Sequence, residues 1–317
     1  MTTRKLTAET TGPVTIDATL TGHGGTVTVR AEAGCERATL TIHTADEEGE
    51  AADAVRAASI RQAGTTLYAS VQGKGGTGGG GTTIITGGGR NVVQSVVSNN
   101  RGSTIQIGGS IIGGNFVGVS GGSVVGDVIV NGVRFTGGGG ATIIQGSSPI
   151  EITAIVPEGS SVIGGTQSAD IVAEGALLNV SGNTQSGDVR AGHVSKVAAS
   201  TQSGDVRVDK AAFIDAKTMS GDIRLGSTDV VEGTTMSGDI TIADFGGSAR
   251  LKTMSGDIRA HATTGGDLSA STMSGDIDIT ATEAALADDL DVITSTVSGS
   301  VRAPQRRMGG SQPRRRR

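Results

Sequence analysis

The sequence is poor in aromatic residues, cysteine and proline. Only 2% of its 317 residues are aromatic, with no Trp, one Tyr and four Phe, whereas Gly occurs 53 times. Small and β-branched side chains must therefore fill any core, and its cross-section should be thin. Five Pro without a Gly-X-Y period exclude a collagen triple helix. The single cysteine, Cys35, excludes an intramolecular disulfide and a paired-cysteine metal site.

Long apolar runs are also missing. No stretch approaches the roughly 18 consecutive apolar residues of a membrane-spanning helix, so we expect no such span. The first residues, Met1 to Leu6, have no apolar run behind their charges, so we expect no signal peptide. These observations predict a cytoplasmic protein, and a surface or extracellular position would need an export route without a signal peptide.

The charge of the chain is unevenly distributed. The formal net charge is −5, but six Arg near the C-terminus contribute +6, which leaves −11 for the rest. Residues 304–317 cannot form a core, so we expect a disordered tail. The tail could bind a polyanion such as nucleic acid or an anionic membrane, or it could only aid solubility. Its arginines, which are candidate interaction residues, are Arg306, Arg307, Arg314, Arg315, Arg316 and Arg317.

One phrase, Thr-x-Ser-Gly-Asp-Ile/Val, recurs between residues 161 and 303. Its eight copies, two of them imperfect, begin at Thr166, Thr184, Thr201, Thr218, Thr235, Thr253, Thr272 and Thr296. Successive copies are 17 to 19 residues apart, except for a final step of 24. A short fixed period with β-branched residues and Gly turns indicates stacked β rungs. The sequence therefore predicts an all-β fold, a parallel β-helix (β-solenoid) of about 17–18 residues per rung.

The alternation of side chains within a rung predicts which ones point inward. In the fourth copy, Ile214, Ala216, Thr218 and Ser220 share one side, and Met219 lies on the other. After Gly-Asp the alternation shifts by one residue, so Gly-Asp should form a corner. We expect Thr and Ser inward and a column of Gln or Met outward. Its four methionines are candidate interaction residues, because Met adapts to varied surfaces: Met219, Met236, Met254 and Met273.

The Asp of each copy should stack into a ladder, since neighbouring rungs lie about 4.8 Å apart. One hypothesis is a Ca²⁺ site, because calcium prefers six to eight oxygen ligands. The favoured alternative is that each Asp accepts hydrogen bonds from the backbone of its own corner. The candidate ladder is Asp188, Asp205, Asp222, Asp239, Asp257 and Asp276, preceded by Asp170. Countercharge is available two residues further on, from Arg190, Arg207, Arg224 and Arg259. We expect no cofactor.

The four histidines, His23, His43, His193 and His261, lie far apart in the sequence. Their mostly polar surroundings favour solvated imidazoles over metal ligands.

The chain before the repeats divides by composition into two parts. Residues 1–72 predict a small β-rich unit, because apolar residues alternate there, with one short helix in the Ala-rich stretch 47–59. Residues 73–160 form a Gly-rich β segment. A flexible linker is one interpretation of it. Recurring pairs such as Ile84-Ile85 and Val92-Val93 favour short strands with tight Gly turns, which could add irregular rungs.

The repeated phrase resembles the bacterial putative-adhesin family of β-strand-repeat proteins (domain of unknown function 4097). The resemblance is strong over about 160–302 and looser over 1–72, where Gly12-Pro13-Val14 also looks like actinobacterial members. It implies a parallel β-helix and, by the family's name, adhesion. It provides no catalytic residue.

We therefore expect a non-enzymatic, adhesin-like β-solenoid that serves as a binding or structural module for an unknown protein or surface ligand. A self-assembling intracellular scaffold is the alternative, because the ends of a solenoid expose unpaired strand edges. A carbohydrate-active β-helix enzyme is the third hypothesis. It would need a carboxylate pair or basic residues in a groove, and sugar rings usually stack on aromatic faces. The repeats contain only Phe213 and Phe245, and their carboxylates are evenly spaced.

Overall fold

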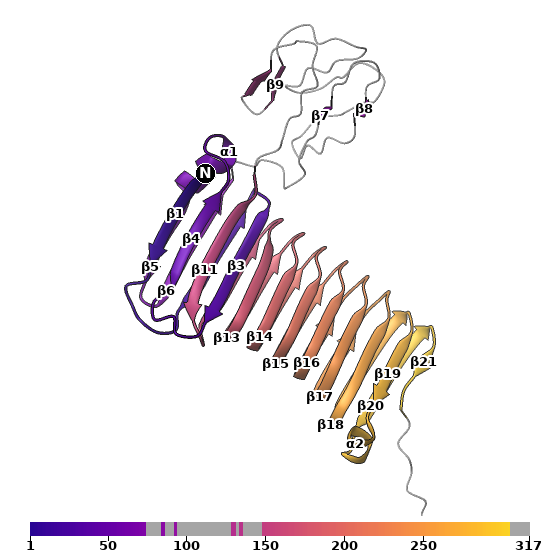
Figure 1. Cartoon of the computed structure of the whole chain (residues 1–317). Coiled ribbons are helices and arrows are strands. Elements are labelled where there is room, and N and C mark those ends of the chain that lie inside the picture. The colour runs from indigo at the N-terminus through magenta and orange to yellow at the C-terminus, as the bar shows by residue number, and fades with distance from the viewer. Residues whose placement is uncertain (74–83, 86–91, 94–127, 131–132, 136–147, 305–317) are drawn as a thin grey trace, which may run out of the picture.

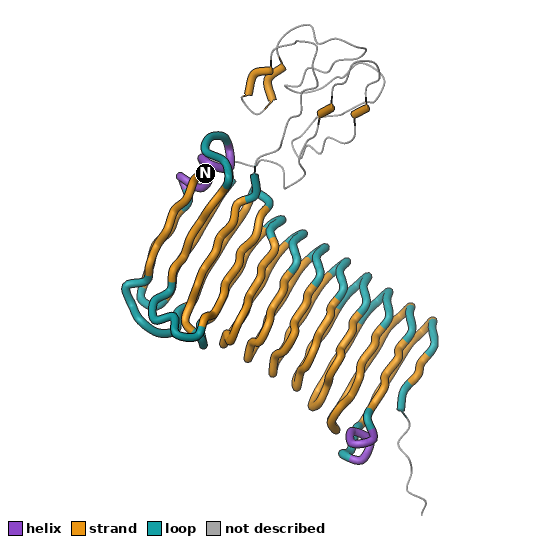
Figure 2. The backbone as a smooth tube through the Cα atoms, in the orientation of Figure 1, coloured by secondary structure: helices purple, strands orange, loops and turns teal. Residues whose placement is uncertain are grey.

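The computed structural model describes residues 1–73, 84–85, 92–93, 128–130, 133–135 and 148–304. Within these ranges, 17 strands form one continuous sheet that winds as a β-solenoid (Figure 1). The tube in Figure 2 shows the rungs stacked from the N-terminal end to the C-terminal end. The predicted all-β solenoid is confirmed.

The regular rungs are six long strands that pair in parallel. They are β13 (Asp170–Thr184), β14 (Val189–Thr201), β15 (Val206–Thr218), β16 (Ile223–Thr234), β17 (Ile240–Lys252) and β18 (Ile258–Ser274). The first part of β13 pairs with β3 (Gly25–Glu32), and its last part pairs with β12 (Ser161–Thr166). Each long strand therefore bends and contributes to two separate stacks. The pairing of Val189 with Val206 and of Thr201 with Thr218 keeps the period of the sequence.

The N-terminal strands continue both stacks. On one side, β3 pairs with β11 (Ile150–Pro157), which pairs with β4 (Thr39–Thr44) and then β1 (Thr2–Thr7). On the other, β12 pairs with β2 (Thr15–Thr21), followed by β6 (Thr66–Gln72) and β5 (Ser59–Ala63). The outermost strands β1 and β5 are antiparallel to their neighbours. The alternation in residues 1–72 thus predicted strands correctly, and these strands belong to the same sheet as the repeats.

Helix α1 (Glu50–Ala57) packs against β1, β4 and β6 at the N-terminal end. Its Ala51, Ala52, Ala54 and Val55 are buried, so it covers the core there. This is the helix that the Ala-rich stretch predicts.

The last rungs contain an element that the sequence did not predict. After β19 (Ile277–Ala281), the chain forms α2 (Glu283–Ala287) before β20 (Asp291–Ser298) and β21 (Val301–Arg302). The hydroxyl of Thr282 caps α2 by accepting the N–H of Ala285 at 3.1 Å. The long final step of the repeat thus accommodates a one-turn helix. With eight and five residues, neither helix in the described part of the chain is long enough to cross a membrane.

The core is one cluster of Ala, Val, Ile and Leu that runs the length of the solenoid. Phe245 is the one aromatic side chain among its largest fully buried members. Phe213 is instead 52% exposed. The scarcity of aromatic residues therefore fits a thin core filled by β-branched and small side chains.

In the Gly-rich segment, two strand pairs lie among the described residues, and the first of them consists of the predicted Ile84-Ile85 and Val92-Val93. β7 (Ile84–Ile85) pairs antiparallel with β8 (Val92–Val93), and β9 (Val128–Val130) pairs antiparallel with β10 (Val133–Phe135). These are separate two-stranded sheets and not rungs of the solenoid. The other apolar pairs of the segment lie outside the described residues.

Candidate functional site

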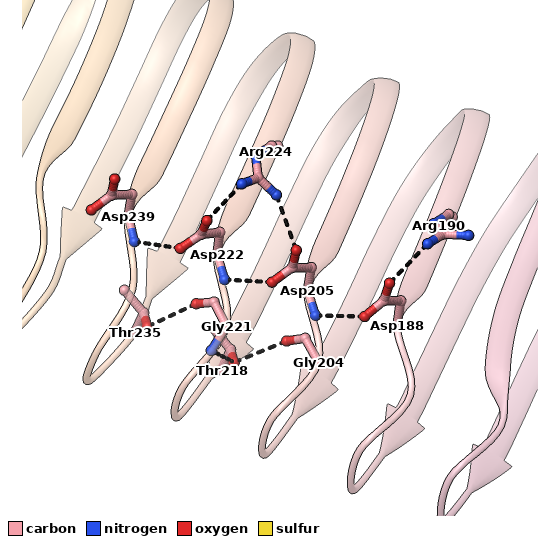
Figure 3. Close-up of polar contacts among 10 residues, drawn as sticks. All are labelled: Asp188, Arg190, Gly204, Asp205, Thr218, Gly221, Asp222, Arg224, Thr235 and Asp239. Carbon is pink, nitrogen blue, oxygen red and sulfur yellow. Dashed lines mark hydrogen bonds and ion pairs between the residues drawn. The ribbon is translucent and has the colours of Figure 1, made fainter. Parts of the chain in front are cut away.

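The threonine of each repeat lies at the corner and points into the core, as predicted. At Thr218 the hydroxyl makes two hydrogen bonds (Figure 3): Oγ1 accepts the N–H of Gly221 at 3.0 Å and donates to the carbonyl oxygen of Gly204 at 3.3 Å. The first bond closes the turn, and the second joins it to the preceding rung. Thr201 makes the same pair, whereas the recorded bond of Thr235, Thr253 and Thr272 is the donated one. The buried threonines are Thr166, Thr184, Thr201, Thr218, Thr235, Thr253 and Thr272.

The prediction that the serines point inward is wrong. Ser220 is exposed, and the buried position in the corner belongs to Gly221. The chain turns immediately after Thr218, so the alternation breaks two residues earlier than the sequence suggests. The backbone of Ser220 still bonds to the preceding rung, because its N–H donates to the oxygen of Gln202 at 3.0 Å.

The glycine is required by the close approach of the rungs. A Cβ built on Gly221 would lie 1.9 Å from the carbonyl oxygen of Gly204. No side chain fits there without moving the rungs apart.

The aspartates form the predicted ladder, but with a different bonding pattern. Asp188 Oδ1 accepts the backbone N–H of Asp205 at 2.9 Å, and Asp205 Oδ1 accepts that of Asp222 at 2.9 Å (Figure 3). The same bond recurs from Asp170 to Ser300, at 2.7 to 2.9 Å. We expected each carboxylate to bond to the backbone of its own corner. Each carboxylate instead accepts a hydrogen bond from the next rung. The side chain reaches along the stack because the next N–H is one rung spacing away.

Arginines hold the outer oxygens of the ladder. Arg224 bridges Asp222 at 2.6 Å and Asp205 at 3.0 Å. Arg259 makes the equivalent bridge to Asp257 and Asp239, and Arg190 pairs with Asp188. Arg207 instead lies 3.5 Å from Asp209. These side chains are about half exposed, so each ion pair contributes at most about 1 kcal/mol.

The last carboxylate of the ladder is electrostatically distinct. Hydrogen bonds from Ser300 lower the pKa of the Asp276 carboxyl, with smaller help from Arg302 and Arg259.

Most carboxylate oxygens of the ladder already have hydrogen-bond or ion-pair partners, so few are available to bind a cation. The inner oxygens accept backbone N–H groups, and several outer oxygens face arginine. No group of three or more His, Cys, Asp or Glu side chains that could hold a metal lies among the described residues. The ladder from Asp188 to Asp276 is thus a structural device, and calcium binding stays a hypothesis.

The methionine column points outward, as predicted. Met219, Met236, Met254 and Met273 are 50%, 45%, 48% and 54% exposed. They lie on successive rungs at the same corner. Their role in binding stays a prediction. The tail arginines Arg306, Arg307 and Arg314 to Arg317 lie outside the described residues.

A shallow groove was missed by the sequence analysis. Its volume is about 530 Å³, and it lies over the later part of the long strands. Exposed Phe213 and Val230 line it, with Asp215, Glu232 and Arg250 beside them. Phe213 and Val230 are register partners, one period apart. Two large apolar residues one period apart at an outward position are a sequence signal that could have predicted this groove.

The prediction that the histidines are solvated is wrong for His23. This side chain is 5% exposed and lies against Gly73 at the corner between β2 and β3. Its Nε2 has no hydrogen-bond partner among the described residues. Burial lowers the pKa of His23, and Glu50 opposes this shift.

These features define a class of protein: a parallel β-solenoid with a hydrogen-bonded corner and regular outward columns. The chain belongs to the Toastrack family, domain of unknown function 4097, whose model matches residues 85–316. The match begins within the Gly-rich segment, which the sequence resemblance had left out, and does not include residues 1–72.

Three solved structures are similar to this chain at low identity. One is a putative adhesin from Parabacteroides distasonis, with 12% identity, TM-score 0.43 and 95% of each chain covered. Another is a putative lipid binding protein from the same species, with 11% identity, TM-score 0.43 and 95% and 97% covered. The third is a putative adhesin from Parabacteroides merdae, with 10% identity, TM-score 0.36 and 95% and 96% covered. No curated protein matches the chain.

Proposed function

We propose that this protein is a non-enzymatic, adhesin-like binding module whose outward methionine column contacts a protein or surface ligand. The observation that supports this most is the exposure of Met219, Met236, Met254 and Met273, each near one half, on consecutive rungs. Isolated exposed apolar side chains are normal on protein surfaces, but a row of them is typical of an interaction site.

The column is a linear surface with regular spacing. Its side chains are about 4.8 Å apart, since they belong to adjacent parallel strands. Methionine is flexible and polarisable, so it can adapt to an irregular apolar partner. In earlier rungs the equivalent position is occupied by Gln185 and Gln202, and in the last copy by Val297, so the apolar part begins at Met219 and continues to the C-terminal end of the column. A partner with a narrow apolar strip fits this surface best.

The test uses the natural variation of the column. A variant with glutamine at all four methionine positions should keep the fold, because other rungs have glutamine there. A photo-reactive amino acid at position 236 should crosslink a discrete partner in the producing organism, and excess unlabelled wild-type protein should suppress the crosslink. Excess quadruple variant should not. The matched control places the photo-reactive group at Thr241, on a strand outside the column. Equal crosslinking from both positions, or suppression by the quadruple variant, would refute the proposal.

A self-assembling scaffold is the second candidate. It is supported by the outer edge of β20, which pairs with no described strand. Negative-stain imaging separates the two, since filaments favour the scaffold, whereas single rods or end-to-end pairs of rods favour a binding module. The proposal also treats the protein as non-enzymatic, and release of reducing sugar from a panel of polysaccharides would contradict that.

A further inference from the structure

Strand β20 (Asp291–Ser298) forms an open edge at the C-terminal end. It pairs with β18 on one side, and no described strand pairs with its other side. Its eight residues contain no Pro and one charged residue, Asp291. An edge strand of this length without protecting charges is a ready template for another strand.

The outward side chains of this edge are unusually exposed for aliphatic residues. Ile293 is 64% exposed and Val297 is 80% exposed. They lie on the same side of β20, because outward residues alternate along the strand. The edge therefore combines unpaired backbone groups with two exposed β-branched side chains.

The N-terminal end, unlike the C-terminal end, has charged edge strands and a helix that covers the core. Its outermost strands, β1 and β5, run antiparallel to their neighbours β4 and β6 and carry charged residues, among them Arg4, Lys5 and Arg61. Helix α1 covers the core beside them. Charged edge strands and a covering helix are common means of preventing strand pairing. Within the described part of the chain, the N-terminal end is therefore protected and the C-terminal end carries an unpaired edge strand.

We propose that β20 pairs in antiparallel orientation with β20 of a second copy of this chain, which joins two solenoids by their C-terminal ends. This occupant follows from the sequence of the strand, which is complementary to itself. In an antiparallel pair, residues directly opposite each other project to the same side of the sheet. A twofold axis at Ser295 places Ile293 opposite Val297 of the second copy, twice. It also places Thr294 opposite Thr296 on the core side.

Other registers fit less well. A twofold axis at Thr294 would place Ile293 opposite Ser295 and Val297 opposite Asp291. A shift by half a step would set inward residues opposite outward ones, which the pleat does not allow. With the axis at Ser295, the two Asp291 side chains lie at opposite ends of the paired segment, about 27 Å apart at roughly 3.4 Å per residue. Their repulsion is then screened.

The expected assembly is a closed dimer, because β20 is the one long unprotected edge strand of the described residues; the other strand at this end, β21, has two residues and carries Arg302. The dimer does not need the partner of the methionine column, although Val297 occupies the position of the last repeat copy that is equivalent to Met273.

The test is the molar mass of the full chain by size-exclusion chromatography with light scattering over a range of concentrations. The wild type should approach twice the mass of one chain. The double variant Ile293→Lys/Val297→Lys should raise the dissociation constant of the dimer at least about tenfold. In this register each lysine at 293 would face a lysine at 297 of the second copy, and the like charges would repel. The matched control is Phe213→Lys/Val230→Lys, which changes two exposed apolar residues that share the groove with Ile293 but lie on the inner strands β15 and β16, and it should leave the dimer intact. A wild type that stays monomeric, that forms filaments, or whose dimer responds equally to both variants would overturn the proposal.

The register has its own test. In a Cys35→Ser background, Ser295→Cys should form a covalent dimer on oxidation, because the two thiols meet at the axis within disulfide reach. Ser271→Cys is the control, since Ser271 is the register partner of Ser295 on the inner strand β18. Crosslinking at 271 but not at 295 would exclude this register.

Discussion

Thr218 and Ser220 lie two residues apart in one corner, but their hydroxyl groups have different environments. Thr218 is buried and bonds to two backbone groups, whereas Ser220 is exposed. A buried donor or acceptor without a partner is costly, so the hydroxyl of Thr218 should matter and that of Ser220 should not.

Replacing Thr218 by Val keeps the shape of the side chain and removes both bonds. We expect the free energy of unfolding to fall by about 1–2 kcal/mol, because the N–H of Gly221 loses its acceptor. Ser220→Ala is the control and should change stability by less than about 0.5 kcal/mol. Chemical denaturation measures both. Equal losses would mean that the hydroxyl bonds of the corner are not what stabilises it.

His23 makes stability depend on pH. Because burial lowers its pKa in the folded protein, the unfolded chain takes up a proton more readily as the pH falls below the ordinary value of 6.5. Above pH 6.5, His23 should not affect the free energy of unfolding. Below pH 6.5, the free energy of unfolding should decrease as the pH falls. His23→Gln should reduce the loss between pH 7.5 and pH 5.5, measured by denaturation at both pH values. The exposed His193, replaced by Gln, should leave it unchanged. The same pH dependence in all three proteins would rule out His23 as its source.

At the scale of the elements, the contact between successive corners decides how closely the rungs pack. Gly221 lies directly on the carbonyl of Gly204, whereas a Cβ on Gly192 would meet its nearest atom at an ordinary 3.6 Å.

Gly221→Ala should therefore lower the free energy of unfolding by about 1–3 kcal/mol through overpacking. Gly192→Ala should be nearly neutral. Thermal melts followed by circular dichroism would compare them, and a neutral Gly221→Ala would show that the rungs can separate locally without cost.

The elements also show which parts of the structure the sequence could predict. The period and the alternation of the sequence correctly predicted the solenoid, the inward threonines and the outward methionines. These features depend on local backbone geometry that is the same in every repeat. The position of Ser220 was missed, since alternation alone cannot tell at which residue a turn begins. The bond from Asp188 to the next rung was missed because it depends on the spacing of strands in three dimensions. Helix α2 was missed because five residues are too few for a periodic pattern.

At the scale of the whole molecule, the regular rungs contact mainly their neighbours. Stability in such a protein is close to a sum over rungs and interfaces.

Deleting Val206 to Asp222, which is one complete period, should leave a shorter solenoid that still folds. Its pairing is preserved because Asp205 then precedes Ile223, as Asp222 does now. Deleting Val206 to Gly221 is the control, since it leaves one extra residue and shifts the alternation. We expect a cooperative melt for the first protein and aggregation or a broad transition for the second. Indistinguishable behaviour would contradict a modular solenoid.

The aspartate ladder has a consequence for how such a chain can lengthen. Each Asp bonds to the next copy of itself, so a rung added by tandem gene duplication brings both its own donor and its own acceptor. No compensating change elsewhere in the gene is needed. The final copy is the exception: no described rung follows it, and its position in the ladder is occupied by Ser300, whose N–H still donates to Asp276. Ser300 thus closes the ladder of the described residues: it donates its N–H to Asp276 but has no carboxylate to accept the N–H of a further rung.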